Sequence, residues 1–183
     1  MPRIPFPDHS KQPDRIRQQV EKGINAGKIF SLASEPVWDG FWDFSLALLY
    51  NSKLDAQLRE LAILRVGHLS GCAYEVYQHE PFARKVGLPD ERIRAIKGGL
   101  PNPVFTPAEA AVIAFTDDIV KNIRAGDDTL AGVRAIMDDS CLMDLMMAIG
   151  WYMMACRVFM TTDLDIDVKP MEFPDEPPPL SKD

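Results

Sequence analysis

Residues 70–87 read SGCAYEVYQHEPFARKVG and bring a cysteine, a glutamate and a histidine within eight positions of one another. Each residue of an α-helix turns the chain by about 100°. If this stretch is helical from residue 71, Cys72, Glu75 and His79 therefore fall within about 60° of arc. The sequence predicts that the three side chains share one face of a helix.

This face has two chemical interpretations. Glu75 and His79 are four positions apart, so the carboxylate can orient the imidazole for general acid–base chemistry. With Ser70 as the predicted N-cap, Cys72 falls in the first turn, where unpaired N–H groups stabilise a thiolate. The structural alternatives are a surface pair for Glu75 and His79 and a small buried hydrophobe for Cys72. One cysteine with one histidine is a poor zinc set, so no metal site is predicted.

The composition bounds the class of protein. The chain has 183 residues, of which 46% are hydrophobic, and this suits one globular domain with a full core. The net charge of −7 argues against a nucleic-acid partner, because phosphate contacts need a basic surface. The most apolar stretch, residues 145–156, is about half as long as a membrane span and predicts a buried helix rather than a membrane segment.

The cysteines and the N-terminus bear on the compartment. The chain has three cysteines, an odd number, and they are widely spaced. The first fifteen residues contain four prolines and no apolar run, unlike a secretory signal. We therefore expect reduced thiols and a cytoplasmic location.

Helical periodicity is common along the chain and strand signals are nearly absent. Thr106 and Glu109 form a capping-box pattern that marks a helix start, and Gly87 is placed to end an earlier helix. Ser140 is the predicted cap of the most apolar helix, and Gly67, Ser70 and Gly71 are expected to loosen the chain between two helices. Helices are expected over residues 13–27, 38–49, 55–69, 71–86, 88–96, 106–123, 128–137 and 141–160. The prediction is an all-α, single-domain bundle of about seven or eight helices.

Composition also divides the chain into three parts. We expect residues 1–37 to be an N-terminal extension with a weak helix, and residues 38–160 to be the helical domain. Residues 161–183 form a proline-rich tail that should be extended or disordered, because five of its last fifteen residues are proline.

The segment LDAQLRELAILRVGHLSGCAYEVYQHEPFARKVGLPDERI, residues 54–93, resembles the carboxymuconolactone decarboxylase family, which includes the alkylhydroperoxidase D-like proteins. The resemblance rests on an Arg-Glu pair, Arg59 and Glu60, followed by CAYEVYQH and then by small residues. The distance of twelve positions from Glu60 to Cys72 matches the spacing of the family's proton-relay glutamate. The resemblance implies an all-helical, alkylhydroperoxidase D-like fold.

The family has two branches, and Glu75 separates them. The peroxidase branch carries Cys-x-x-Cys, in which the second cysteine attacks peroxide and the first resolves the product. Here Glu75 takes the place of the second cysteine, and Cys72 remains at the resolving position. Cys141 or Cys156 could replace the missing thiol only by lying against Cys72. The decarboxylase branch carries Tyr-Glu-x-x-x-His, which YEVYQH follows, with Val76 where an aromatic residue is usual.

The resemblance implies cofactor-independent decarboxylation, or a related proton transfer, on a small lactone or keto acid. His79 is then the expected proton donor, and Glu60 and Glu75 have orienting or relay roles. Arg59 or Arg65 is expected to bind a substrate carboxylate, unless both are solvent-facing helix residues. Tyr74 is a further candidate for substrate binding, and Cys72 a further catalytic candidate.

The resemblance also implies a homotrimer or homohexamer with no cofactor. Two alternative functions stay open. The first is a thiol antioxidant of the alkylhydroperoxidase kind that uses Cys72. The second is a non-catalytic ligand-binding or assembly protein with the same fold.

Overall fold

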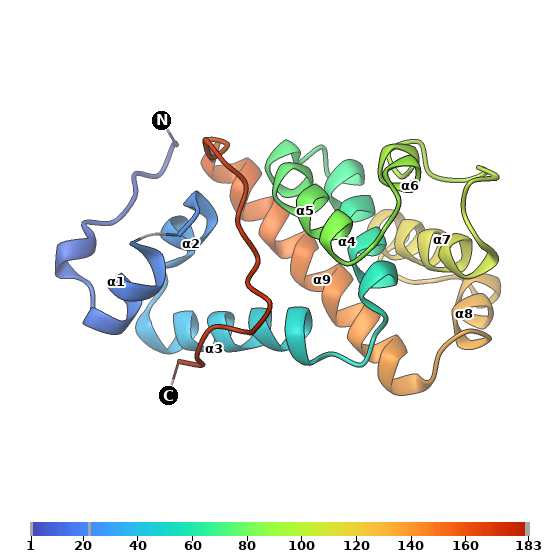
Figure 1. Ribbon diagram of the computed structural model, residues 1–183, viewed down its shortest axis with the longest axis horizontal. Helices are drawn as coiled ribbons and strands as arrows, with labels where there is room; N and C mark the ends of the chain where they lie inside the picture. Colours follow the sequence, from blue (N-terminus) through green and yellow to red (C-terminus); the bar gives the residue numbers. More distant parts are fainter. Residues whose placement is uncertain (1, 22, 182–183) are drawn as a thin grey trace. The chain divides into compact units, whose positions relative to one another are not determined.

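The computed structural model describes residues 2–21 and 23–181, and within these ranges the chain forms nine α-helices, two short irregular helices and no strand. The prediction of an all-α fold is therefore confirmed. The contacts divide the chain into two compact units. Unit 1 comprises Met1–Asn51 and Phe159–Asp183, and unit 2 comprises Ser52–Val158. Figure 1 shows the element order, with α9 (Asp139–Thr162) as one continuous helix that contributes to both units.

Unit 1 is built from short helices around a small aromatic core. Its elements are η1 (His9–Lys11), α1 (Asp14–Val20), α2 (Asn25–Phe30), α3 (Glu35–Leu46) and the π-turn η2 (Ala47–Asn51). The single helix predicted over residues 13–27 is thus two helices. Ile24, before α2, has an extended backbone, and the nearby Gly23 disfavours helix continuation. Ile16, Val20 and Trp38 form the buried cluster of this unit.

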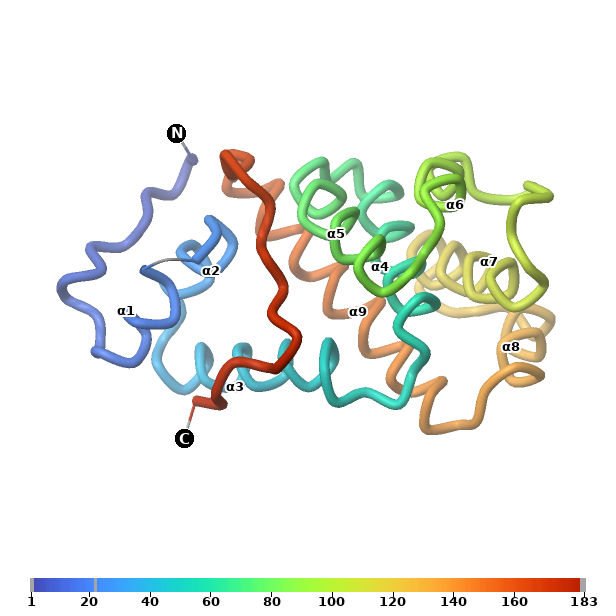
Figure 2. The backbone as a smooth tube through the Cα atoms, in the orientation of Figure 1, coloured from blue at the N-terminus to red at the C-terminus, as the bar shows by residue number. Residues whose placement is uncertain are grey.

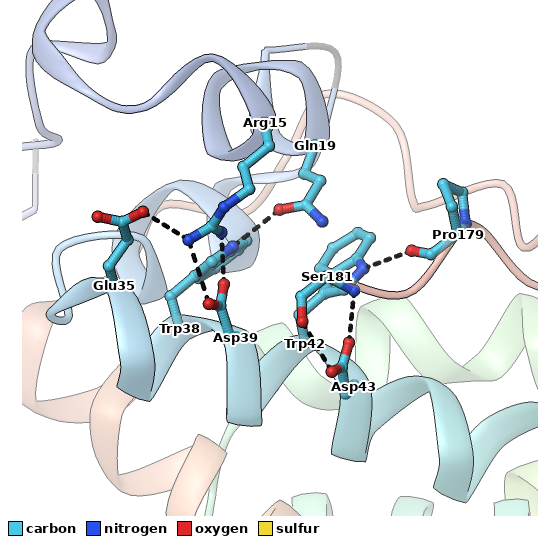
Figure 3. A network of polar contacts seen from close by, with 9 residues as sticks. All are labelled: Arg15, Gln19, Glu35, Trp38, Asp39, Trp42, Asp43, Pro179 and Ser181. Carbon is cyan, nitrogen blue, oxygen red and sulfur yellow. Dashed lines mark hydrogen bonds and ion pairs between the residues drawn. The ribbon is translucent and has the colours of Figure 1, made fainter. Parts of the chain in front are cut away.

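Side-chain contacts join α1 to α3 (Figure 3). Arg15 pairs with Glu35 at 2.6 Å and with both carboxylate oxygens of Asp39. The indole N–H of Trp38 donates to Gln19 at 2.8 Å. These contacts fix the short first helix, whose sequence alone has a weak helical pattern.

The proline-rich tail is extended, as expected, and Figure 2 traces it as a segment without helical turns. It is also tied to α3. The indole N–H of Trp42 donates to the Pro179 carbonyl at 3.0 Å, and Ser181 donates through both its backbone N–H and its hydroxyl to Asp43, each at 2.7 Å (Figure 3). The tail therefore has a defined path through residue 181.

Unit 2 carries the candidate site. Its helices are α4 (Ala56–Leu69), α5 (Ala73–Lys85), α6 (Asp90–Ala95), α7 (Pro107–Asn122), α8 (Asp127–Arg134) and the part of α9 up to Val158. Helix α4 is central: every residue from Arg59 to Gly67 is buried, and the helix packs against both α5 and α7. The core cluster around α4 includes Leu61, Leu64, Ala83, Ile93, Ile96 and Ile113.

Two predicted helix ends are confirmed. Thr106 accepts from the Glu109 N–H, and the Glu109 carboxylate accepts from the Thr106 N–H at 2.7 Å, so the capping box starts α7. Gly87 follows the end of α5 with a φ of 91°, a conformation that glycine adopts without a steric penalty.

Two predicted caps are wrong. Ser70 is the C-cap of α4 rather than the N-cap of the next helix, and Cys72 itself is the N-cap of α5. The cause is Gly71, whose φ of 64° breaks the helical path between them. At the start of α9, the N–H of Cys141 donates to Asp138 at 2.8 Å, so Asp138 has the capping role expected of Ser140.

Within the described residues, α9 is the one helix long and apolar enough to cross a membrane. Its 24 residues exceed the twelve-residue apolar run seen in the sequence. The core helix of a soluble protein meets the same criteria, so this finding by itself is weak evidence for a membrane span.

Candidate active site

The centre of the site is a contact between α4 and α5. Glu60 Oε2 lies 2.7 Å from His79 Nδ1, and both side chains are buried. Glu60 lies in the middle of the buried run of α4, so water does not compete for this contact. The carboxylate fixes the orientation of the imidazole ring.

A second carboxylate contacts the other ring nitrogen of His79. Glu75 Oε1 lies 3.1 Å from Nε2, and Glu75 is one helical turn before His79 on α5. The four-residue spacing therefore produces the contact that the sequence indicated. His79 is held between Glu60 and Glu75, so the three groups form one continuous chain for a proton.

Arg59 extends this chain at the Glu60 end. Its Nε donates to Glu60 Oε1 at 3.2 Å, and its guanidinium lies over the Phe82 ring, 5.7 Å from the centroid. Arg59 is buried, so the alternative of a solvent-facing helix arginine does not describe it. Its positive charge balances the buried Glu60 carboxylate.

Gly67 brings the two helices close enough for these contacts. A Cβ atom at this position would meet Val76 Cγ2 at 3.0 Å and Glu75 Cβ at 3.4 Å. Gly67 lies inside α4 and is buried, so it does not loosen the chain as expected. Its missing side chain lets α5 approach α4 at Glu75.

The buried charges shift the proton affinities of the site. Burial raises the pKa of Glu75 to about 7, and the Glu60 charge adds to the increase while His79 opposes it. Burial lowers the pKa of His79, but the charges of Glu60 and Glu75 outweigh this effect, so the pKa lies above its usual 6.5. Near neutral pH, Glu75 therefore exchanges a proton readily, which is the property a general acid or base needs.

Helix α9 contributes two residues near the site: Tyr152, which was not expected there, and Cys156, which was one of two possible partners for Cys72. The Tyr152 ring packs edge-on against the His79 imidazole, with centroids 4.8 Å apart. Cys156, one turn later, is a hydrogen-bond partner of Cys72. The signal in the sequence was their four-residue spacing, which puts both on one face of α9.

Cys72 lies at the start of α5, beside Glu75. The pKa of its thiol is lowered. The hydrogen bond from Cys156 is the largest cause; burial opposes it, and the backbone N–H groups of Glu75 and Tyr74 contribute further. The free thiols of Cys72 and Cys156 are both buried.

Arg65 has a different environment from Arg59. Its guanidinium forms a paired contact with the Asp117 carboxylate at 2.5 and 2.8 Å and donates to the carbonyls of Ile96 and Lys97. A Cβ atom at Gly99 would lie within 2.5 Å of this guanidinium. These contacts favour a structural role for Arg65, and its binding of substrate stays a prediction.

The remaining candidates can be placed more briefly. Tyr74 is buried in the first turn of α5, next to Glu75, and its role in binding stays a prediction. Across the described ranges, no group of three or more His, Cys, Asp or Glu residues is arranged to hold a metal ion. The structure thus brings together Glu60, Glu75, His79 and Arg59, with Cys72 at one side.

Comparison with solved structures identifies the class of fold. The chain is similar to an alkylhydroperoxidase AhpD core protein, an uncharacterized peroxidase-related protein from Ralstonia eutropha, with a TM-score of 0.78 and 18% identity over 91% of this chain and 93% of that one. A protein of unknown function from Agrobacterium tumefaciens, provisionally assigned to AhpD antioxidant defence, gives a TM-score of 0.69 and 23% identity over 76% and 95% of the two chains. These TM-scores establish a shared fold.

Comparison of sequences finds a family that part of the chain resembles. Residues 36–118 match the sequence model of the Carboxymuconolactone decarboxylase family. The uncharacterized protein YdfG of Bacillus subtilis is 28% identical over 101 residues, which cover 54% of this chain and 69% of YdfG. Over residues 36–118 the chain is thus similar to the Carboxymuconolactone decarboxylase family, and its fold is similar to that of the alkylhydroperoxidase AhpD core protein.

Proposed function

We propose that this protein is a cofactor-independent acid–base enzyme of the decarboxylase type, acting on a small lactone or keto acid. The observation that carries the proposal is His79 held between two buried carboxylates, one of which has a pKa of about 7. A carboxyl group with this pKa is half protonated at neutral pH, so it can both give and take a proton.

The contacts support a specific order of proton transfer. His79 uses both ring nitrogens for Glu60 and Glu75, so Glu75 is the group at the end of the chain. The contact with His79 uses Glu75 Oε1, and we assign the other carboxylate oxygen, Oε2, to the substrate. We therefore assign the proton donor role, expected of His79, to Glu75, with His79 and Glu60 resupplying the proton.

In the proposed reaction, the substrate itself accepts the electron pair, so no cofactor is required. When the substrate carboxylate leaves as CO₂, its electron pair passes through a double bond into the lactone or keto carbonyl. Glu75 then gives its proton to carbon as the enolate collapses, and His79 returns a proton to Glu75. Arg59 uses Nε for Glu60, and its two terminal nitrogens are suited to bind a carboxylate.

The test is a screen of small lactone and keto acids that monitors CO₂ release and deuterium uptake at carbon in D₂O. Glu75→Gln should lose both signals. Glu80→Gln is the matched control: Glu80 lies on the same helix but pairs with Arg84, so this variant should keep both signals. Equal turnover in Glu75→Gln and the wild type would contradict the proposal.

We also propose that the chain assembles into a homotrimer or homohexamer. Met143 and Met147 are exposed one turn apart on α9, and such a face favours association. Light scattering at micromolar concentration should give a mass several times 20.5 kDa. A stable monomer would contradict this assembly.

The thiol antioxidant remains the second candidate function. The observation that favours it is the Cys72–Cys156 contact, because the sequence left a partner for Cys72 open.

A further inference from the structure

A small site on α3 holds the tip of the proline-rich tail, residues 177–181. The indole N–H of Trp42 donates to the Pro179 carbonyl at 3.0 Å (Figure 3). Both oxygens of the Asp43 carboxylate accept from Ser181, one from its N–H and one from its hydroxyl, each at 2.7 Å. Two adjacent residues of α3 thus make three hydrogen bonds to three consecutive positions of the tail.

The α3 side of this site has a fixed shape. The Trp42 ring stacks on the Trp38 ring, with centroids 5.7 Å apart and planes 27° apart. Trp38 is fully buried, and its indole N–H donates to Gln19 of α1 at 2.8 Å. The ion pair of Arg15 with Asp39 joins the same two helices. The core of unit 1 therefore holds Trp42 in place, and the site is pre-organised for an extended segment.

The tail side is suited to such a site by its composition. Residues 177–179 are three successive prolines, whose rings fix the backbone φ at about −65° and keep the segment extended. Such a segment loses little conformational freedom when it docks, and aromatic surfaces commonly bind it. The groups used are the carbonyl of Pro179 and the N–H and hydroxyl of Ser181. The site therefore fits a proline run that ends in Pro-x-Ser.

The tip can leave this site without unfolding of the rest of the tail. Residues 174–177 and 179–180 are exposed, so few contacts hold them. The tail is anchored before this stretch, because Phe173 is only 7% exposed and Asp167 accepts from the Asn25 N–H at 2.9 Å. The eight residues after Phe173 span about 26 Å when extended, at roughly 3.3 Å per residue. That length is enough to reach a neighbouring molecule.

We propose that the Trp42–Asp43 site binds the tail tip of a second copy of this chain, in exchange with the tip of its own chain. The occupant is a second copy because every copy carries both the site and a segment that fits it. The three hydrogen bonds are the same whether the tip belongs to one chain or to the other, so each copy can give a tip and receive one. The inference is independent of the proposed decarboxylation, because the site lies in unit 1 and the acid–base residues lie in unit 2.

The first experiment supplies the tip as a free peptide. The fluorescein-labelled peptide PDEPPPLSKD, residues 174–183, is added to the full-length Ser181→Asp chain, whose own tip is repelled by Asp43. Fluorescence anisotropy should show saturable binding. A peptide with alanine in place of the serine should bind roughly tenfold more weakly or worse, the usual effect of losing a hydrogen bond to a charged group. The full-length double variant Asp43→Ala/Ser181→Asp should not bind the peptide, and circular dichroism checks its folding.

The second experiment asks whether whole chains exchange tips. Full-length protein with photoreactive p-benzoylphenylalanine in place of the exposed Leu180 is prepared in a light and a heavy isotope form, and equal amounts are mixed for hours before irradiation. Trypsin releases α3 in residues 29–53 and the tail in residues 158–182. The expected product joins a light tail peptide to a heavy α3 peptide, and the reverse, and its share should rise with protein concentration.

The matched control carries the photoreactive group at Val168, which is 98% exposed but lies before the Phe173 anchor. This protein should give no mixed product with residues 29–53. The proposal would be overturned if the Leu180 protein gave only light–light and heavy–heavy products, because the tip would then stay on its own chain. Products that miss residues 29–53, or a peptide that does not bind the Ser181→Asp chain, would overturn the site itself. None of these outcomes depends on turnover, so the proposed decarboxylation stands or fails separately.

Discussion

Glu60 and His79 lie on different helices and 19 positions apart, yet Glu60 Oε2 is 2.7 Å from His79 Nδ1 inside the core of unit 2. Because the other ring nitrogen contacts Glu75, a change at any of the three residues alters the proton affinity of the other two.

The first prediction concerns coupling in catalysis. Glu60→Gln and His79→Gln should each lower turnover roughly 10²–10⁴-fold, the usual worth of general acid–base catalysis. The double variant should be little slower than the worse single variant, because members of one relay act as a unit. Melting curves on the same samples separate lost chemistry from lost folding. If the loss of turnover in the double variant equalled the product of the two single losses, the residues would not form a relay.

The second prediction concerns stability and pH. Glu75 has a folded pKa of about 7 and an ordinary value of 4.5, so between these values the folded chain binds more protons than the unfolded chain. Its contribution to stability is therefore present at low pH and lost as the pH rises through 7. Between pH 5 and 8, the wild type should lose roughly 2 kcal/mol relative to Glu75→Gln. Urea unfolding at both pH values measures this, and parallel curves for the two proteins would refute the shifted pKa.

The third prediction concerns the approach of α5 to α4. Gly67→Ala should destabilise the fold by about 1–3 kcal/mol, since its Cβ would crowd Val76 and Glu75. Gly150→Ala is the matched control: it is also a helical glycine, but nothing lies within 4 Å of a Cβ there. That variant should gain about 0.5–1 kcal/mol from helix propensity. A Gly67→Ala protein as stable as Gly150→Ala would mean that the helices are not in close contact.

The fourth prediction separates the two buried arginines. Asp117→Asn removes the carboxylate that pairs with Arg65 and should lower the free energy of unfolding by roughly 2–4 kcal/mol. Turnover per folded molecule should stay the same, because this pair is structural. A raised KM with unchanged stability would instead support the substrate-binding role that the sequence suggested for Arg65.

Local sequence patterns predicted the parts of the site that lie on one helix. The four-residue spacing of Glu75 and His79 determines their contact, and the capping box of Thr106 and Glu109 needs residues only three apart. The start of α5 was harder to predict, because serine is one of the residue types most often found at the N-cap of a helix. The left-handed backbone of Gly71 moves the cap to Cys72, and a sequence does not display that angle.

Contacts between distant segments were not predictable in the same way. Arg65 finds its partner Asp117 52 positions later, and Cys72 finds Cys156 on another helix. Helix α9 is apolar nearly all round, so its pattern does not tell which face meets α5. The relation of Glu60 to His79 was available only through the family resemblance.

The most direct test of the relay is an NMR pH titration of the histidine side chains, with His79→Gln used for assignment. His79 should titrate above 6.5, and Glu60→Gln should move its pKa down, because the Glu60 charge raises it. His68 is an internal reference in the same spectrum: burial and Lys97 lower its pKa below 6.5, and the Glu60 substitution should not change it. A His79 pKa at or below 6.5 that is the same with and without Glu60 would contradict the account.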